Sequence, residues 1–169
     1  MSLDFLKRLL SAPGPSTQET RPASVWREEA ATFADDIRID LRGNTFAVLN
    51  GSTDVPRVML AGHIDEIGIV VTYIDDDGFL WFTGVGGWDP QVLVGQRIKL
   101  LGKNGDVIGV IGKKAIHLMK PEEREKASKI EDLWIDIGVS GRAEALEQIR
   151  VGTVGVIEGA IYDFPHGRV

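Results

Sequence analysis

The chain has 169 residues, a formal net charge of -6 and a sequence pI near 5.1. It contains no cysteine, which excludes a disulfide framework and a thiolate metal site. It also has no basic cluster, so nucleic acid and anionic membranes are poor partners. The first residues lack the layout of a signal peptide, and no apolar run reaches the roughly 20 residues of a membrane helix. The sequence therefore predicts a cytoplasmic protein.

The first residues have the spacing of two helices. Apolar side chains recur at helical intervals over residues 3–10, and Ser2 can cap the start of that helix. Ser16 stands three residues before Glu19, which is the spacing of a capping box and predicts a second helix starting there. Pro22 is expected to delay the regular turns of this helix.

Two strands and a short apolar run come next. Residues 37–41 alternate apolar and polar side chains, a turn signal follows at Gly43, and residues 45–49 predict the returning strand. Val58 to Ala61 is an unbroken apolar run, which predicts a short strand covered on both faces. Two helices, a strand pair and a buried strand are typical of the edge of an α/β sheet.

After residue 67 the pattern changes to short strands separated by glycine-rich turns. This pattern predicts a small β-barrel or sandwich. Two helices are expected to interrupt it, over residues 122–129 and 143–149, with Ser140 as the cap of the second. The predicted strands cover residues 69–74, 79–82, 96–101, 107–111, 134–138 and 154–157.

Three chemically reactive residues directly follow the predicted buried strand. His63 and Asp65 are two positions apart, so in an extended chain they point the same way, whereas Glu66 points the other way. Ligands of open α/β sheets gather beyond the carboxyl ends of strands, and a carboxylate can orient an imidazole that binds a metal. On spacing alone, a buried histidine hydrogen-bonded to Asp65 is the simpler interpretation.

Other candidate sites have simpler explanations. His117 is a lone histidine on an apolar stretch and is interpreted as structural. Asp163 and His166 have a spacing that would chelate a metal on a helix, but Pro165 argues against a helix there. The run from Asp75 to Gly78 looks like the start of a calcium loop, but it lacks the closing glutamate and is interpreted as a solvated turn.

The run Ala61-Gly-His-Ile-Asp-Glu-Ile-Gly68 resembles the signature of the M42 family of metalloaminopeptidases. Two further runs, Pro13-Gly-Pro-Ser16 and Asp40-Leu-Arg-Gly-Asn44, resemble other segments of that family. The resemblance implies an α/β zinc-peptidase-type domain, present in part, with an inserted small β-barrel or sandwich domain. The implied boundaries are residues 1–67 for the start of the peptidase domain, 68–158 for a β-rich dimerisation domain, and 159–169 for the return to the peptidase domain.

The resemblance also implies a chemistry. Family members cleave N-terminal residues from short peptides with water activated by two divalent metal ions, zinc or cobalt. His63 would be a metal ligand, and Asp65 the catalytic carboxylate that holds its ring. The motif that bridges the metals, the general base and the remaining ligands would lie beyond Val169. The chain thus offers at most one ligand and is expected to be inactive alone.

Two alternatives remain. In the first, the β-rich domain is a non-catalytic oligomerisation module, and self-association through it is expected because the resemblance implies that this domain pairs subunits. In the second, the chain has cellulase-type activity, which is disfavoured because Asp65 and Glu66 face apart in a strand, whereas glycosidases need carboxyl groups facing across ~5–9 Å. An uncovered apolar strand at Val58 to Ala61 also predicts that the lone chain associates or is poorly soluble.

Overall fold

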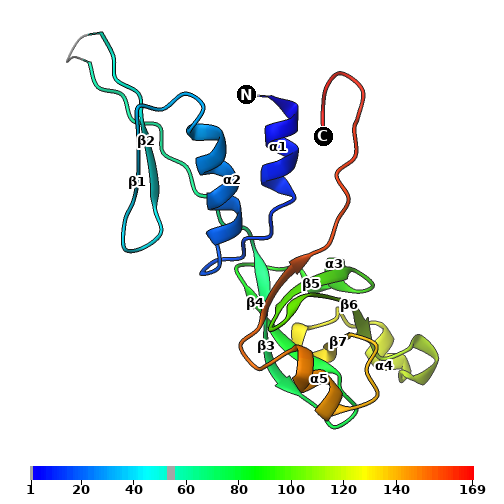
Figure 1. Cartoon of the computed structure of the whole chain (residues 1–169). Helices are drawn as coiled ribbons and strands as arrows, with labels where there is room; N and C mark the ends of the chain where they lie inside the picture. The colour runs from blue at the N-terminus through cyan, green and yellow to red at the C-terminus, as the bar shows by residue number, and fades with distance from the viewer. Residues whose placement is uncertain (1, 53–55) are drawn as a thin grey trace. The chain divides into compact units, whose positions relative to one another are not determined.

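The structure is a computed structural model that describes residues 2–52 and 56–169. The chain divides into two compact units: one includes the residues up to Glu66 and the segment Asp163–Val169, and the other is Ile67–Tyr162 (Figure 1). The described residues contain no helix long and apolar enough to span a bilayer. The first unit contains α1 (Leu3–Leu10), α2 (Thr20–Ala30), β1 (Asp36–Ile39) and β2 (Thr45–Val48).

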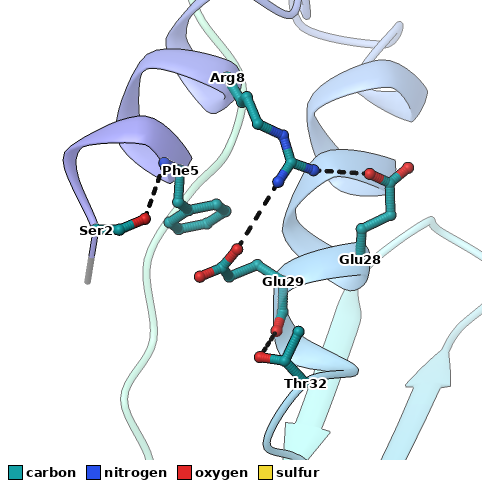
Figure 2. A network of polar contacts seen from close by, with 6 residues as sticks. All are labelled: Ser2, Phe5, Arg8, Glu28, Glu29 and Thr32. Atoms are coloured by element: carbon teal, nitrogen blue, oxygen red, sulfur yellow. Dashed lines mark hydrogen bonds and ion pairs between the residues drawn. The ribbon is translucent and has the colours of Figure 1, made fainter.

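Helix α1 begins where the sequence predicts. The hydroxyl of Ser2 accepts a hydrogen bond from the Phe5 N–H at 3.1 Å, and the Phe5 side chain is buried. Arg8 donates to Glu28 at 2.8 Å and lies 3.9 Å from Glu29, so it links α1 to α2 (Figure 2). The side chains of these pairs are 30% to 61% exposed, and pairs this open to solvent contribute only about 0–1 kcal/mol each.

Helix α2 does not begin as predicted. Its N-cap is Glu19, which makes no side-chain capping bond, and Ser16 lies outside the helix. The expected capping box of Ser16 and Glu19 is therefore wrong. Pro22 occupies the third helical position without delaying the helix, because the first-turn N–H groups have no helical partner to lose.

Strands β1 and β2 form the predicted antiparallel hairpin. Its turn is organised by Asp40, whose carboxylate accepts hydrogen bonds from the backbone of Arg42 and from the backbone and side chain of Asn44, at 2.8–2.9 Å. The Asn44 side-chain bond is the main cause that holds the pKa of Asp40 below its usual range. Gly43 supplies the left-handed conformation of the turn, with φ of 87°.

The predicted buried strand at Val58 to Ala61 is wrong. The segment pairs with no strand among the described residues, and Val58, Met59 and Leu60 are 79%, 82% and 94% exposed. The apolar run correctly indicates a segment suited to burial. Burial on two faces also needs neighbouring strands and a covering layer, and the described part of this unit offers only two helices and one hairpin.

The second unit is a closed antiparallel barrel, which confirms the predicted fold class. Its strands follow the order β3-β4-β7-β6-β5-β8, and β8 pairs back onto β3. The strands are β3 (Gly68–Ile74), β4 (Leu80–Val85), β5 (Arg97–Gly102), β6 (Gly105–Lys113), β7 (Leu133–Asp136) and β8 (Val154–Ile157).

Alternate residues of the barrel strands form its core. On β5, for example, Ile98 and Leu100 are fully buried while Arg97 is exposed, as expected for strands with one face inward. The backbone of β6 passes so close to β7 that a Cβ on Gly109 would lie 2.5 Å from Ile135. The core consists of Ile69, Val71, Ile74, Leu80, Phe82, Leu93, Ile98, Leu100, Ile111, Leu133, Ile135, Ala145 and Ile149.

One of the two helices predicted for the barrel unit is shorter than expected. The charged stretch gives only one helical turn, α4 (Pro121–Arg124), rather than a helix to Lys129. Helix α5 (Arg142–Gln148) lies where expected, but its N-cap is Gly141, and the predicted Ser140 cap is wrong. The remaining short elements are α3 (Pro90–Leu93), η1 (Ile116–Leu118) and η2 (Ile130–Asp132).

Candidate active site

The segment that carries His63 and Asp65 is anchored to the loop between α1 and α2. Glu66 donates its N–H to the Gly14 carbonyl at 3.0 Å and accepts from the Ser16 N–H at 3.3 Å, which forms a parallel bridge between Pro15 and Glu66. The Glu66 carboxylate also accepts the Gly14 N–H at 2.9 Å. Three hydrogen bonds therefore fix this segment to one short loop.

The loop itself is rigid. Pro13, Gly14 and Pro15 are all buried, and the two prolines have restricted φ angles. A Cβ on Gly14 would lie 2.4 Å from the ring of Pro22 in α2, so only glycine fits against the helix at this position. The loop consequently offers a fixed support for the residues that bind to it.

His63 and Asp65 lie in contact, as their spacing predicts. Nδ1 of His63 is 3.0 Å from Oδ1 of Asp65 and 3.1 Å from the backbone carbonyl oxygen of the same residue. The carbonyl oxygen is always an acceptor, and the carboxylate oxygen is only an acceptor when Asp65 is ionised. Nδ1 must therefore carry the hydrogen. In the neutral ring Nε2 then keeps its lone pair and is the nitrogen able to bind a metal. The His63 side chain is 87% exposed, which excludes the buried-histidine interpretation.

Asp65 is held on its other side by Ser16. The Ser16 hydroxyl donates to Oδ2 of Asp65 at 2.5 Å, so separate donors occupy the two carboxylate oxygens. The Ser16 bond first, and the His63 bond second, hold the pKa of Asp65 below its usual range. Asp65 is therefore an ionised acceptor, the state needed to orient an imidazole.

The described residues fit one ligand of a metal centre. His63 has the donor, the orienting carboxylate and the exposure that a zinc or cobalt ligand needs. Within residues 2–52 and 56–169, however, no three His, Cys, Asp or Glu side chains lie close enough together to hold an ion.

Sequence reasoning misassigns one residue near this pair. Ser16 is predicted to cap a helix, but its hydroxyl binds Asp65. For Glu66 the sequence predicts only that it points away from His63 and Asp65, and it gives no hint that the carboxylate accepts the Gly14 N–H. The available signal was the Pro13-Gly-Pro-Ser16 run, which resembles the same family as the His63 segment. Segments that both resemble one family's pattern, such as residues 13–16 and 61–68, are candidates for contact with each other in the fold.

Among the described residues, the other candidate sites bring together no three His, Cys, Asp or Glu side chains that could hold a metal ion. His117 is exposed in η1, and Asp163 makes an ion pair with Lys7 at 2.5 Å. His166 lies in a turn with φ of 66° rather than in a helix. The Asp75 carboxylate accepts hydrogen bonds from the Phe79 backbone and the Trp81 indole, so it organises the β3–β4 turn.

Comparison with known proteins places this combination of units among aminopeptidases. The chain belongs to the M42 glutamyl aminopeptidase family, whose family model matches residues 43–169. It is 35% identical over 158 residues to the lysyl aminopeptidase of Pyrococcus furiosus. The aligned stretch covers 90% of this chain and 44% of that protein.

Two solved structures extend the comparison to the fold. A TET aminopeptidase from a marine sediment archaeon of the Thaumarchaeota matches with a TM-score of 0.92 and 35% identity, over 98% of this chain and 46% of that one. The TET1 peptidase of Pyrococcus horikoshii, which can assemble into a tetrahedron or a large octahedral shell, matches with a TM-score of 0.81 and 34% identity, over 93% of this chain and 47% of that one.

The chain thus spans less than half the length of these relatives. Family membership implies a dinuclear metal centre in the intact enzyme, and His63 is the one imidazole of the described site that fits it.

Proposed function

We propose that this chain is the N-terminal portion of a metal-dependent aminopeptidase that removes N-terminal residues from short peptides. In this proposal Nε2 of His63 is a metal ligand, and Asp65 is the carboxylate that fixes the ring. The hydrogen bond between Nδ1 of His63 and Asp65 is the observation that carries the proposal.

The chain's own residues supply orientation in this reaction. Asp65 holds the imidazole and raises its basicity, and the Gly14–Glu66 contacts keep the pair in place. The metal pair, when bound, would activate water and polarise the first peptide carbonyl of the substrate. In this proposal the general base and the remaining ligands come from residues outside this chain, so the chain alone is expected to be inactive.

A zinc titration of the ¹⁵N-histidine-labelled chain tests this assignment. We expect the Nε2 signal of His63 to shift, with His117 and His166 unaffected. His63→Ala should remove the response and His117→Ala should leave it unchanged. A response at His117 or His166 with none at His63 would overturn the ligand assignment. Hydrolysis of aminoacyl anilides by the chain alone, insensitive to His63→Ala, would overturn the proposed role of the site.

A second candidate function is self-association through the barrel. The outward face of β6 carries Ile108 and Val110, each 46% exposed, and their neighbours across β5 are Lys99 and Arg97. An apolar pair bordered by charged side chains has the composition of a small interface. The TET1 peptidase of Pyrococcus horikoshii, whose match covers 93% of this chain, can assemble into a tetrahedron or a large octahedral shell, which supports the idea.

Light scattering on charge variants separates the two apolar surfaces of the chain. If the barrel pairs subunits, Ile108→Glu should lower the mass of the oligomer and Leu60→Glu should not. The opposite result would locate association at the exposed Val58–Leu60 run. If the native chain itself has the mass of a monomer, self-association is excluded.

A further inference from the structure

Ser16 acts on the candidate metal ligand through Asp65. The Ser16 hydroxyl donates to Oδ2 of Asp65 at 2.5 Å, and Nδ1 of His63 lies 3.0 Å from Oδ1. Because the two oxygens are bound by different donors, the carboxylate cannot rotate about its terminal bond without losing one of them. We propose that Ser16 is a positioning residue that fixes the Asp65 carboxylate so that it holds His63 in its metal-binding orientation.

Ser16 does not cap helix α2. The spacing of Ser16 and Glu19 predicts a helix cap, but α2 begins at Thr20 and its N-cap is Glu19. The side chain of Glu19 accepts the Thr17 N–H instead of closing a capping box. The Ser16 hydroxyl bond therefore goes to the carboxylate 49 residues further along the chain rather than to the nearby helix.

The backbone presents Ser16 at some conformational cost. Residues 15–18 form a tight turn in which the Gln18 N–H donates to the Pro15 carbonyl at 2.8 Å. Thr17 has φ of 81° in this turn, a conformation that suits glycine and is a rare outlier for a β-branched residue. Such outliers persist where the surroundings enforce them and gather at functional sites.

The consequence concerns which ring nitrogen of His63 carries the hydrogen. With the carboxylate fixed, Nδ1–H has two acceptors on Asp65, the carboxylate and the carbonyl oxygen. With Ser16 removed, the carboxylate is free to turn toward water and the ring keeps only the weaker carbonyl partner. The role of Ser16 deepens the proposed function, since it matters to catalysis only if His63 binds metal.

Histidine ¹⁵N NMR on the metal-free whole chain tests the role of Ser16. At a pH of about 8.5 histidine side chains are in general neutral, so the nitrogen shifts report the tautomer. We expect wild-type His63 to carry its hydrogen on Nδ1. In Ser16→Ala the ratio of the Nδ1–H to the Nε2–H form should fall about two- to fivefold, the range for weakening one hydrogen bond.

Two variants make the result specific. Ser16→Thr keeps the hydroxyl and should restore the wild-type ratio. Ser11→Ala removes an exposed hydroxyl at the other end of the same loop and should leave the ratio unchanged. If Ser16→Ala loses the dispersed signals of the first unit, Ser16→Cys replaces it, because a thiol has similar size but donates weakly. An unchanged His63 ratio in a folded variant without the hydroxyl overturns the proposal.

A zinc titration of the same samples separates this inference from the proposed function. If Ser16→Ala shifts the tautomer but zinc leaves wild-type His63 unaffected, the positioning contact stands and the metal-ligand assignment fails. If zinc shifts His63 equally in wild type and in Ser16→Ala, and the tautomer does not change, His63 remains a ligand and Ser16 has no positioning role.

Discussion

The barrel and the first unit treat their apolar residues in opposite ways. In the barrel, thirteen residues form one buried cluster, and each of the six strands pairs with two neighbours. In the first unit the buried apolar residues include Phe5, Ala23 and Ala30, while Leu41, Leu49 and the Val58–Leu60 run are largely exposed. The barrel thus buries its apolar side chains within its own fold. The first unit also has apolar residues suited to a core, but its described elements do not form the layers that would cover them.

This difference places the candidate site in the less packed unit. The contacts that hold His63 are therefore polar and link segments about fifty residues apart: three hydrogen bonds join Glu66 to Gly14 and Ser16, and a fourth joins Ser16 to Asp65. A few polar contacts between distant segments can thus fix the geometry of a candidate ligand where no full core encloses it.

The largest test of the comparison is truncation of matched leucines. Leu100 is fully buried in the barrel and Leu60 is 94% exposed. Leu100→Ala should lower the free energy of unfolding by about 2–5 kcal/mol because it leaves a cavity, and Leu60→Ala should change it by less than about 0.5 kcal/mol. Urea unfolding, monitored for each variant by amide signals of the unit that carries the leucine, measures both. Equal costs would mean that the exposed run is covered in solution.

Matched glycines sharpen the same comparison. A Cβ on Gly109 would collide with Ile135, whereas a Cβ on Gly62 would meet nothing within 4 Å. Gly109→Ala should cost about 1–3 kcal/mol through overpacking, and Gly62→Ala should lie within about 0.5 kcal/mol of wild type. Thermal melts of the two variants provide the measurement. A neutral Gly109→Ala would show that β6 and β7 leave room for a methyl group at this position.

The strained turn predicts a stabilising change in the first unit. Thr17→Gly should raise the stability of this unit by about 1 kcal/mol, because relief of the left-handed strain exceeds the added entropy of glycine. Hydrogen exchange of the α2 amides measures it. Gln18→Gly is the control, since Gln18 lacks a positive φ and should gain nothing. A destabilised Thr17→Gly would mean that the threonine side chain makes a needed contact.

The smallest expected effect is the pH dependence of the β1–β2 turn. The pKa of Asp40 is lowered in the folded hairpin, so its contribution to stability is present above the unfolded-chain pKa of about 3.9 and disappears as pH falls through the lower folded value. Amide shifts of Arg42 and Asn44 should report this loss below about pH 4. Asp40→Asn should abolish the dependence, and Asp77→Asn, in an exposed barrel turn, should not.

Much of the fold could be predicted because local patterns sufficed. Alternating apolar and polar residues, together with glycine-rich turns, predict all six barrel strands to within a few residues. The pattern is clear because each strand has one inward face. The same reasoning failed at Val58 to Ala61, because a continuous apolar run indicates a need for burial and not the presence of neighbours.

The candidate site was predictable in part for a related reason. The contact between His63 and Asp65 follows from a spacing of two in an extended chain. The contact of Ser16 with Asp65 joins positions 49 residues apart, and no local spacing encodes it. The capping-box signal misled because Ser16 and Glu19 fit a short-range motif, while the turn at Thr17 aims the hydroxyl elsewhere.

The Ser16–Asp65 bond also has a consequence for chain length. It closes a non-covalent ring of about fifty residues that includes α2 and the whole hairpin. The entropy of closing such a ring grows only slowly, by about 0.6 kcal/mol for each doubling of its length. Extra residues at the hairpin tip should therefore change the position of His63 very little. The segment between Ser16 and Asp65 can vary in length and sequence while the contacts that close it stay the same.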